Sequence, residues 1–548
     1  MGVQEVRQVG AGKPLADFFN ELKQRSGYSY EQIGKKCHIS RSTIHRYCTG
    51  NGVPPDFGTV ERIATVCGAN QQDITRLFRL WEQAWSNRAA SAGAVVEPAE
   101  PEPERPANRP QAQPRARRRS VVVAVLAVFA LINGSAQPVH SNEPPGVTAA
   151  APAISAPMWT DSPYPVSDGF VGVTVNSTTG TMPSFRVGSV RLWDSETRWQ
   201  NIEPRRGQFD WSTVDRLVSS ARQDGLSVLF TMGGTPDWAS PNGPDTPYDD
   251  GSRASPPRNM ADWDRFVRRV AQRYRGRIDA YELWDMANHP KFFTGSTETL
   301  VEMTRRASSQ IRAADPDATV VCPSMGELWD RAALQALERF GRLGGYNYCD
   351  VAAVKLYPRK ASDPPETMLN VANEVYKSFH RSGAHLGLWS TGSGFDIPLQ
   401  RPVRPELAAD HAVRFYLTGI YAQYQRMYFY NWGSAKVPLV LQPEGGKPTK
   451  AALFVEELRR WLHDARVHSC GRGAPAGLPK NMWQCRFDRG GKAFLIWWTH
   501  VGTARMTPAA GASAVQRLDG TTSPVDPAKA LVVTPRPVLL RIGRTTES

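Results

Sequence analysis

The feature that most constrains this chain is the apolar stretch at residues 115–136, RARRRSVVVAVLAVFALINGSA. Residues 121–132 contain no charge and no hydroxyl, and four arginines stand directly before them. A bilayer needs about 20 residues of helix, which this stretch reaches when its polar flanks are included. We therefore expect one transmembrane helix at residues 120–138. The arginines place the N-terminus in the cytoplasm and the C-terminus outside, as a single-pass protein of the cell membrane.

Two other interpretations of this stretch stay open. A short apolar run is also typical of a buried core helix, although Pro-rich polar sequence flanks this one on both sides. It also fits the core of a signal peptide, with cleavage after Ala136. Under the transmembrane interpretation the lipid bilayer is a partner, and the two sides of the chain lie in different compartments.

The seven cysteines divide unevenly between those compartments. Three precede the apolar stretch and four follow it: Cys37, Cys48 and Cys67, then Cys322, Cys349, Cys470 and Cys485. A reducing cytosol keeps thiols free, whereas an even number outside suggests disulfides. We expect a Cys470–Cys485 bridge around a Gly/Pro loop. Cys322 and Cys349 stand near opposite ends of neighbouring predicted strands, so their pairing stays open. The spacing of the three N-terminal cysteines fits no metal site, and nothing predicts a cofactor.

Residues 14–88 show the apolar periodicity of five short amphipathic helices. The first ends at Gly27. A helix at residues 29–37, a tight turn at 38–39 and a helix at 41–48 capped by Ser40 give the order helix, turn, helix. Two more helices follow at residues 56–67 and 73–85. The expected core consists of Phe18, Leu22, Ile33, Ile39, Ile44, Ile63 and Ile74.

The stretch SYEQIGKKCHISRSTIHRYCTGNGVP resembles the helix-turn-helix domains of the Cro/repressor class, and the resemblance covers about residues 14–85. It implies a recognition helix in the major groove of duplex DNA. The side chains expected to reach the bases are Arg41, Ser42, Thr43, and His45 or Arg46. Repressors of this class bind paired half-sites, so a homodimer is also expected. The alternatives are a solvated basic helix face, or a domain that binds another protein at the membrane.

Two polar segments rich in proline separate the expected domains. The first, residues 89–119, contains EPAEPEPERPANRP and should form an extended tether. The second, residues 139–163, follows the transmembrane segment. Neither polar, proline-rich segment can form a hydrophobic core.

Residues 164–463 alternate short apolar runs with amphipathic helical runs, which is typical of parallel strands with crossover helices. Eight such units predict a (β/α)8 TIM barrel. The expected strands are Val171–Val175, Ser189–Trp193, Ser227–Met232, Ala280–Trp284, Thr319–Pro323, Val351–Leu356, Leu386–Ser390 and Met427–Trp432. Shorter strands in residues 464–548 predict a small β-sandwich.

Functional groups of a TIM barrel sit at the C-terminal ends of its strands. Aromatic rings stand there beside hydrogen-bonding groups, which suits a sugar with one C–H face and a rim of hydroxyls. The residues expected to bind an extracytoplasmic carbohydrate are Asp194, Trp238, Trp284, Asp285, Asn288, Tyr357 and Trp432. The alternative for the tryptophans is that they fill the barrel mouth.

The segments RLWDSETRWQNIEPRRGQFDW, TMGGTPDWAS, DWDRFVRRVAQRYRGRIDAYELWD, CDVAAVKLYP and YFYNWG resemble retaining glycoside hydrolases of the β-xylosidase/α-iduronidase type, over roughly residues 165–540. That resemblance implies two catalytic glutamates about 5 Å apart, in a Trp-Asn-Glu-Pro motif and a Trp-x-Thr-Glu motif. This chain has WDMAN at residues 284–288 and WSTG at 389–392, so Met286 and Gly392 stand at the two catalytic positions. Lys355 also replaces a histidine that the family tends to carry.

A thioether cannot protonate a leaving oxygen, and glycine has no side chain to attack an anomeric carbon. Three other carboxylates are candidate replacements. Asp285 is expected on the opposite side of its strand, Glu282 facing inward but about 13 Å deeper at 3.3 Å per residue, and Glu444 on a loop after the eighth strand. None restores the pair, so catalytic residues are expected to be absent.

The sequence therefore favours a membrane-anchored regulator that joins a cytoplasmic DNA-binding domain to an extracytoplasmic, catalytically inactive carbohydrate-binding barrel. One alternative is a membrane-tethered glycosidase with relocated carboxylates. The other is a structural anchor for an envelope glycan, whose helix-turn-helix domain binds a protein.

Overall fold

The computed structural model describes residues 13–84, apart from residues 38, 40, 55–56, 71–72, 75, 78 and 82, together with residues 154–392 and 401–543. The predicted transmembrane segment 120–138 and the first linker lie outside the described residues, as does the Ser40 cap. No helix within the described ranges is both long and apolar enough to cross a membrane.

The N-terminal domain is all-helical, as predicted. Its helices are α1 (Lys13–Ser26), α2 (Tyr30–Cys37), α3 (Arg41–Cys48) and α4 (Phe57–Val66), and the described residues between 73 and 84 are helical too. The predicted core is confirmed: six of its seven members are buried, and Ile39 packs against them half-buried. Gly27 and Gly50 follow α1 and α3 with φ of 67° and 77°, which glycine adopts without strain.

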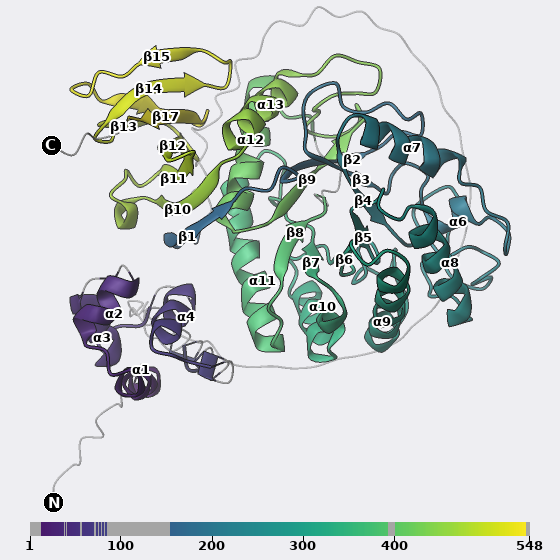
Figure 1. Cartoon of the computed structure of the whole chain (residues 1–548), viewed down its shortest axis with the longest axis horizontal. Coiled ribbons are helices and arrows are strands. Elements are labelled where there is room, and N and C mark those ends of the chain that lie inside the picture. Colours follow the sequence, from purple (N-terminus) through teal and green to yellow (C-terminus); the bar gives the residue numbers. More distant parts are fainter. Residues whose placement is uncertain are drawn as a thin grey trace, which may run out of the picture. The chain divides into compact units, whose positions relative to one another are not determined.

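Eight parallel strands close into a barrel in which β9 pairs with β2 (Figure 1). The strands are β2 (Val171–Val175), β3 (Ser189–Leu192), β4 (Ser227–Thr231), β5 (Ala280–Glu282), β6 (Thr319–Val321), β7 (Val351–Val354), β8 (Gly387–Ser390) and β9 (Arg426–Trp432). The predicted TIM barrel is therefore confirmed. Strands β3 to β7 end one or two residues before the predicted positions, because the chain there turns off the strand to form the mouth.

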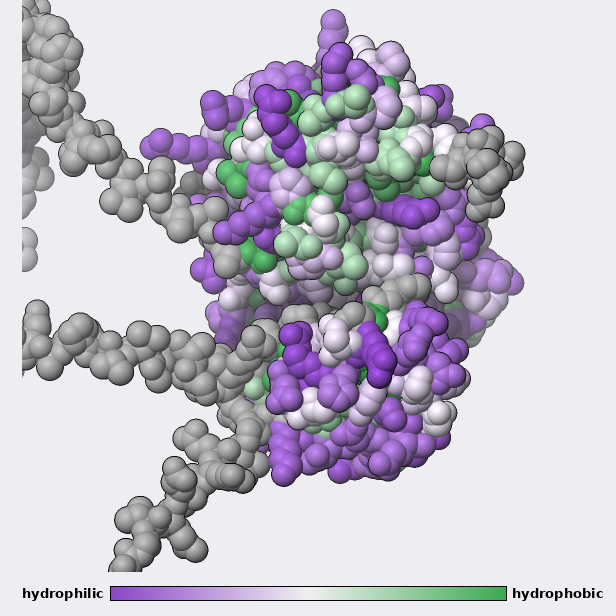
Figure 2. All heavy atoms as spheres, turned by 90° about the vertical axis from the view of Figure 1, so that its left-hand side faces the viewer, coloured by the Kyte–Doolittle hydropathy of each residue, from purple (hydrophilic) through white to green (hydrophobic). Residues whose placement is uncertain are grey.

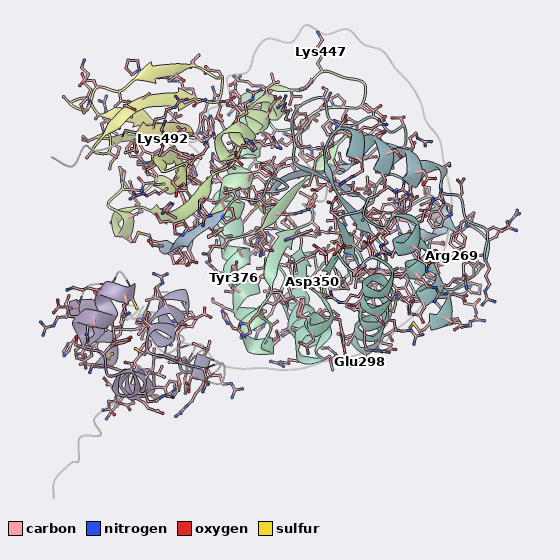
Figure 3. The ribbon with its side chains drawn as sticks, viewed as in Figure 1. Arg269, Glu298, Asp350, Tyr376, Lys447 and Lys492 are labelled. Carbon is pink, nitrogen blue, oxygen red and sulfur yellow. A yellow bond between two sulfur atoms is a disulfide. The ribbon has the colours of Figure 1, made fainter. Side chains whose placement is uncertain are left out.

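Helices surround the barrel (Figure 1). They are α6 (Trp199–Ile202), α7 (Ser212–Gln223), α8 (Met260–Arg273), α9 (Thr297–Ala314), α10 (Arg331–Arg342), α11 (Met368–Ser382), α12 (Pro405–Tyr421) and α13 (Lys450–Leu462). Three 3-10 turns accompany them: η1 (Gly345–Tyr348), η2 (Pro365–Thr367) and η4 (Ala474–Ala476). Figure 3 labels Arg269 on α8 and Glu298 on α9, which point outward from the polar faces of these helices.

The period-2 alternation of the strands builds two apolar shells. Val190 and Leu192 of β3 belong to the large core between strands and helices. Inside the barrel a separate cluster fills the centre: Leu229, Ala280, Val321, Val351, Ala353, Trp389 and Tyr428. Two residues beyond Leu229, Ala280 and Trp389, the next inward side chains form a second layer, nearer the C-terminal ends of the strands.

The C-terminal region forms one seven-stranded antiparallel sheet in the order β1-β10-β11-β12-β17-β14-β15, with a separate two-stranded ribbon, β13-β16. The strands are β1 (Trp159–Pro165), β10 (Arg466–Arg472), β11 (Met482–Arg489), β12 (Lys492–Thr499), β13 (Ala504–Met506), β14 (Ala512–Arg517), β15 (Thr522–Pro524), β16 (Leu531–Val533) and β17 (Val538–Ile542). The predicted β-sandwich is not confirmed. The upper part of Figure 2 shows this side of the molecule, where apolar residues in green are interspersed with hydrophilic ones in purple.

Strand β1 comes from residues that the sequence assigned to the second linker. It is the edge strand beside β10, with Trp159 opposite Cys470. The Trp159 indole donates to the Tyr421 carbonyl at 2.8 Å, and the Arg472 guanidinium donates to the Ile154 carbonyl at 2.8 Å. The chain that follows the linker is therefore fixed both to the C-terminal sheet and to the barrel helix α12 before it enters β2.

Two disulfides are present among the described residues. Cys470 and Cys485 face each other across β10 and β11, with a Cα–Cα distance of 4.1 Å, as the sequence predicted. Cys322 pairs with Cys349, with a Cα–Cα distance of 5.4 Å. The sequence had placed these two near opposite strand ends. Staggering in the barrel aligns Val321 with Val351 and so brings the two cysteines together.

Candidate binding site at the barrel mouth

A polar layer closes the barrel above its apolar centre. Its members continue the inward rows of the strands: Arg191 of β3, Thr231 of β4, Glu282 of β5, Lys355 after β7 and Thr391 after β8. Glu282 follows Ala280 of the inner cluster at a spacing of two, and Lys355 follows Ala353 in the same way. The alternation that fills the barrel therefore also aims these charges at one another.

Four charges meet in this layer. The Arg191 guanidinium donates to the Glu282 carboxylate at 2.6 Å and to Asp285 Oδ1 at 2.5 Å. Lys355 Nζ lies 2.6 Å from Asp285 Oδ1 and 3.9 Å from Glu282 Oε1. Thr231 and Thr391 donate their hydroxyls to the two oxygens of Glu282, at 2.6 and 2.7 Å. Two cations thus neutralise two carboxylates, and both oxygens of Glu282 have partners.

All four side chains of this network are buried, and none exposes more than 6% of its side chain. Burial by itself raises the pKa of Asp285, but Lys355 and Arg191 outweigh it and hold that pKa below its ordinary value. Burial and the neighbouring Arg191 lower the pKa of Lys355, against the pull of the two carboxylates. Pairing of this kind offsets the cost of burying charge, which is large for an unpaired ion.

Asp194 lies beside this network at the end of β3 and belongs to a second polar group. Burial raises its pKa, and the Tyr430 hydroxyl donates a hydrogen bond to it. Nearby, the Trp193 indole donates to the Tyr248 hydroxyl at 2.7 Å, and the Arg198 guanidinium lies 3.9 Å from the Tyr248 ring centroid. Arg198 is itself paired with Asp250 at 2.5 Å.

The two positions that the sequence resemblance assigns to the catalytic glutamates have unusual backbone conformations. Met286 has φ of 48°, and its sulfur lies against Gly326, where a Cβ would be only 2.1 Å from Sδ. Gly392 has φ of 141°, which favours glycine. A Cβ at Gly392 would lie 3.6 Å from Lys355 Nζ and 3.9 Å from Thr174 Oγ1. Position 392 therefore borders the polar layer without filling it.

The predicted direction of Asp285 was wrong: its side chain does not point away from the barrel, because its carboxylate accepts from Arg191. Glu282 faces inward as predicted, but it is not isolated below the mouth, because it accepts from the same guanidinium. The reason is local: β5 ends at Glu282, so residues 283–286 turn instead of extending the strand. A count of 3.3 Å per residue does not apply beyond that end. Glu444 is exposed and accepts hydrogen bonds from Ser177 and Thr179, away from the four charges.

Most of the predicted sugar-binding aromatics are engaged in packing. Trp432 and Trp284 are buried, and their indoles donate to Gln442 at 2.9 Å and to the Phe292 carbonyl at 3.0 Å. Trp238 is half-buried and donates to the Glu203 carbonyl at 2.8 Å, with Arg265 near its ring. Of these three rings only Trp238 is partly exposed, and carbohydrate binding by them stays a prediction.

The remaining predicted residues have backbone partners. Asn288 exchanges two hydrogen bonds of 2.8 Å with the Gly326 backbone. Tyr357 is buried, and its carbonyl accepts from the Trp329 indole at 2.9 Å. Of the seven predicted residues, the structure brings Asp194 and Asp285 together at the mouth. The sequence reasoning did not name Arg191, Thr231 or Thr391, although their inward spacing of two is visible in the strands.

A group of side chains with the spacing of metal ligands occurs away from the barrel mouth. Among the described residues, Asp168, His463 and Asp464 offer ligand atoms within 4.8 Å of one another. All three are exposed, and they lie before β2 and after α13, at the N-terminal end of the barrel.

The helix-turn-helix residues have the exposure that a recognition helix needs. Ile44, Tyr47 and Cys48 of α3 face the core. The opposite side of α3 presents Arg41, Ser42, His45 and Arg46 as exposed residues and Thr43 as a half-buried one.

Comparison with known proteins agrees with a helix-turn-helix domain followed by a barrel. Residues 14–77 match the family of helix-turn-helix domains, and residues 174–278 match the beta-galactosidase family of glycoside hydrolases. No curated protein matches the chain. The chain thus has an N-terminal helix-turn-helix domain and a glycoside-hydrolase-like (β/α)8 barrel.

Two solved structures share the fold of the barrel region. One is a family 39 glycoside hydrolase from Bacteroides cellulosilyticus WH2, with 14% identity and a TM-score of 0.51, covering 69% of this chain and 82% of that one. The other is a monomeric beta-xylosidase from Caulobacter crescentus CB15, with 12% identity and a TM-score of 0.50, covering 71% and 98%. At this identity the similarity establishes the fold alone.

The buried network predicts a large effect of removing one charge. Arg191→Met leaves Glu282 and Asp285 short of a cation, so the barrel should lose about 3–5 kcal/mol of unfolding free energy. Arg305→Met is the matched control, because Arg305 is about half exposed and, among the described residues, forms an ion pair with Glu302 alone. The loss of this exposed pair should cost under about 1 kcal/mol. Urea unfolding followed by tryptophan fluorescence measures both. Equal effects of the two substitutions would contradict the importance of the network.

Proposed function

We propose that this protein is a membrane-anchored regulator whose barrel binds carbohydrate without cleaving it and whose helix-turn-helix domain binds DNA. The observation that carries the proposal is the state of the barrel mouth, where the carboxylates Glu282 and Asp285 are ion-paired. The sequence resemblance adds that Met286 and Gly392 replace the two catalytic glutamates. Because the recognition helix belongs to the same chain, sugar binding by the barrel would regulate DNA binding.

The ion pairs argue against hydrolysis. A general acid needs a pKa near the working pH, whereas Lys355 and Arg191 hold the pKa of Asp285 below its ordinary value. Glu282 has both oxygens occupied by Thr231, Thr391 and Arg191. Neither carboxylate is available to protonate a leaving oxygen or to attack an anomeric carbon.

One observation favours the second candidate, a glycosidase with relocated carboxylates. Burial raises the pKa of Asp194, as a proton donor requires. A retaining mechanism also needs a nucleophile, and Asp285, which is close enough to raise the pKa of Asp194, is held by two cations. Binding without turnover therefore remains the first choice.

The membrane part of the proposal rests on the apolar stretch and its arginines, with residues 120–138 crossing the bilayer and the N-terminus inside. The cysteines support two compartments. Cys37, Cys48 and Cys67 are free and buried, and burial raises the pKa of Cys37 to about 11 and of Cys48 to about 12. The other four cysteines form disulfides. Such a division fits a reducing side and an oxidising side.

Differential alkylation of cells lysed directly into denaturant tests the topology. Thiols are blocked under denaturing conditions, disulfides are then reduced and labelled with a second reagent, and the peptides are analysed by mass spectrometry. We expect the first label on Cys37, Cys48 and Cys67 and the second on the other four, because the membrane separates the two redox environments. The first label on Cys470 and Cys485 would contradict an exported barrel.

DNA binding by the full-length protein should depend on α3. The DNA is a duplex that has been selected for binding to this protein. Arg41→Ala should weaken binding to that duplex by about 1–3 kcal/mol if the Arg41 side chain reads a base. Arg79→Ala is the control, since Arg79 is exposed on the last helical stretch and outside α2 and α3. Fluorescence anisotropy at several salt concentrations measures both variants. Salt-independent binding, or none at low salt, would favour a protein partner for this domain.

The barrel should retain sugars but not cleave them. With aryl xylosides, galactosides and glucosides, turnover should equal the uncatalysed background, because no free carboxylate pair flanks the mouth within the part of the chain that the structure describes. Glycan-array binding scored for retention and for released product tests both halves of the statement. Turnover that disappears in Asp194→Asn would instead support the relocated glycosidase.

A further inference from the structure

A cavity of about 330 Å³ lies at the N-terminal ends of the barrel strands, the end opposite the mouth. Its walls come from the end of β1 with the chain that leads into β2, and from the end of α12 with the turn into β9. One residue each of β8 and β10 completes the lining. The volume is large enough for a small ligand.

Most of the lining is apolar. Four aromatic side chains take part, together with aliphatic ones from α12 and β10: Tyr164, Phe170, Trp389 and Tyr424. In the part of the chain that the structure describes, Arg426 is the only charged residue of the lining. Ligand sites for small organic molecules typically combine such apolar walls with a few polar groups that orient the ligand.

The Arg426 guanidinium is held in place by packing. Arg426 begins β9 and continues the inward row of Tyr428, two residues further along the strand. Its Cζ lies 4.4 Å from the centre of the Trp389 ring. The backbone of Gly169 lies close to it as well, since a Cβ there would be only 3.1 Å from Cζ. One nitrogen, Nη1, donates to the Tyr428 hydroxyl at 3.3 Å.

Arg426 differs from the other interior arginines in having no anion beside it. Arg191 is paired with Glu282 and Asp285, and Arg414 with Glu366. Arg426 is half-buried and forms no ion pair with any described residue. A guanidinium has five N–H donors, and a carboxylate can accept two of them side by side. Partial burial also costs a cation some of its hydration, which an anion in the cavity would offset.

The carboxylate nearest in sequence does not fill this role. Asp168 follows Ser167, which lines the cavity, but Asp168 itself is not part of the lining. It is exposed, and its Oδ1 lies 3.2 Å from Nδ1 of His463. The charge inside the cavity is therefore positive.

We propose that this cavity binds a small organic carboxylate, with the carboxylate group on Arg426 and an apolar body between the aromatic side chains. An inorganic anion would leave the rings uncovered, and a neutral apolar molecule would leave the guanidinium without an anion. The site is separate from the mouth and does not depend on carbohydrate binding. Because its walls include β1 and β9, an occupant would contact both the C-terminal sheet and the barrel.

Isothermal titration calorimetry of the full-length protein in detergent tests the charge requirement. Phenylacetate, phenylethanol and phenethylamine share a phenyl body and carry a negative, a neutral and a positive end, and titration into empty micelles supplies the blank. We expect phenylacetate to bind at least about tenfold more tightly than phenylethanol, and phenethylamine not to bind. Equal affinity for phenylacetate and phenylethanol would overturn the proposal, since Arg426 would then only cap the barrel interior.

Variants of Arg426 locate the effect. Arg426→Met removes the charge and should abolish the preference for phenylacetate. Arg426→Lys keeps the charge but not the paired donors, so the preference should persist with several-fold weaker binding. Arg486→Met is the control, because Arg486 is exposed on β11 and does not line the cavity. Thermal melting checks each fold. A full preference that survives in Arg426→Met would overturn the assignment.

Photolabelling of the unaltered protein keeps the test valid if Arg426→Met unfolds. An aryl azide derivative of phenylacetate is activated by light, and the labelled peptides are identified by mass spectrometry. We expect the label in residues 164–170 or 420–426, and excess phenylacetate should suppress it. Suppressible labelling elsewhere, or no binding of phenylacetate at all, would overturn the site. Neither result would affect carbohydrate binding at the mouth.

Discussion

The barrel mouth depends on the compensation of four buried charges. Arg191, Glu282, Asp285 and Lys355 enter the interior from separate strand ends, and none of them could be buried there alone. Their mutual pairing fixes the directions of the segments that leave β3, β5 and β7. The neighbouring polar groups, including Asp194 and Tyr430, take their positions from those segments. The same pairing leaves neither Glu282 nor Asp285 free to act as an acid or a nucleophile. The interaction that stabilises this site therefore also limits hydrolysis there.

The barrel and the helical domain followed from sequence periodicity. Strand β2 and helix α3 have the predicted bounds, because a strong apolar pattern with clear turn residues determines such elements. Strand ends were less certain, and this mattered at β5, where one early turn moved Asp285 into the polar layer. Periodicity gives the direction of a side chain only while the strand continues.

The aromatic residues show another limit of sequence reasoning. Trp284 and Trp432 stand at strand ends, where a sugar-binding ring would also stand, yet both are covered by neighbouring protein groups. Composition cannot distinguish a ring that faces a ligand from one that closes the mouth. The charge network was hidden for a similar reason, since Arg191, Glu282 and Lys355 are far apart in the chain and meet only when the barrel closes. The β1 strand was assigned to a linker because its sequence, WTDSPYP, is polar and contains proline.

The attachment of β1 gives the chain a defined mechanical path. Tension along the linker would first reach residues 154–158, which hydrogen-bond to α11 and α12, and would then pull β1 along its own length against β10. In that direction the hydrogen bonds between the two strands resist as a group, and the Trp159 and Arg472 contacts add to them. The load would then pass into β10 and, through the Cys470–Cys485 bridge, into β11. A pull from the linker would therefore be shared between the C-terminal sheet and the barrel helices α11 and α12.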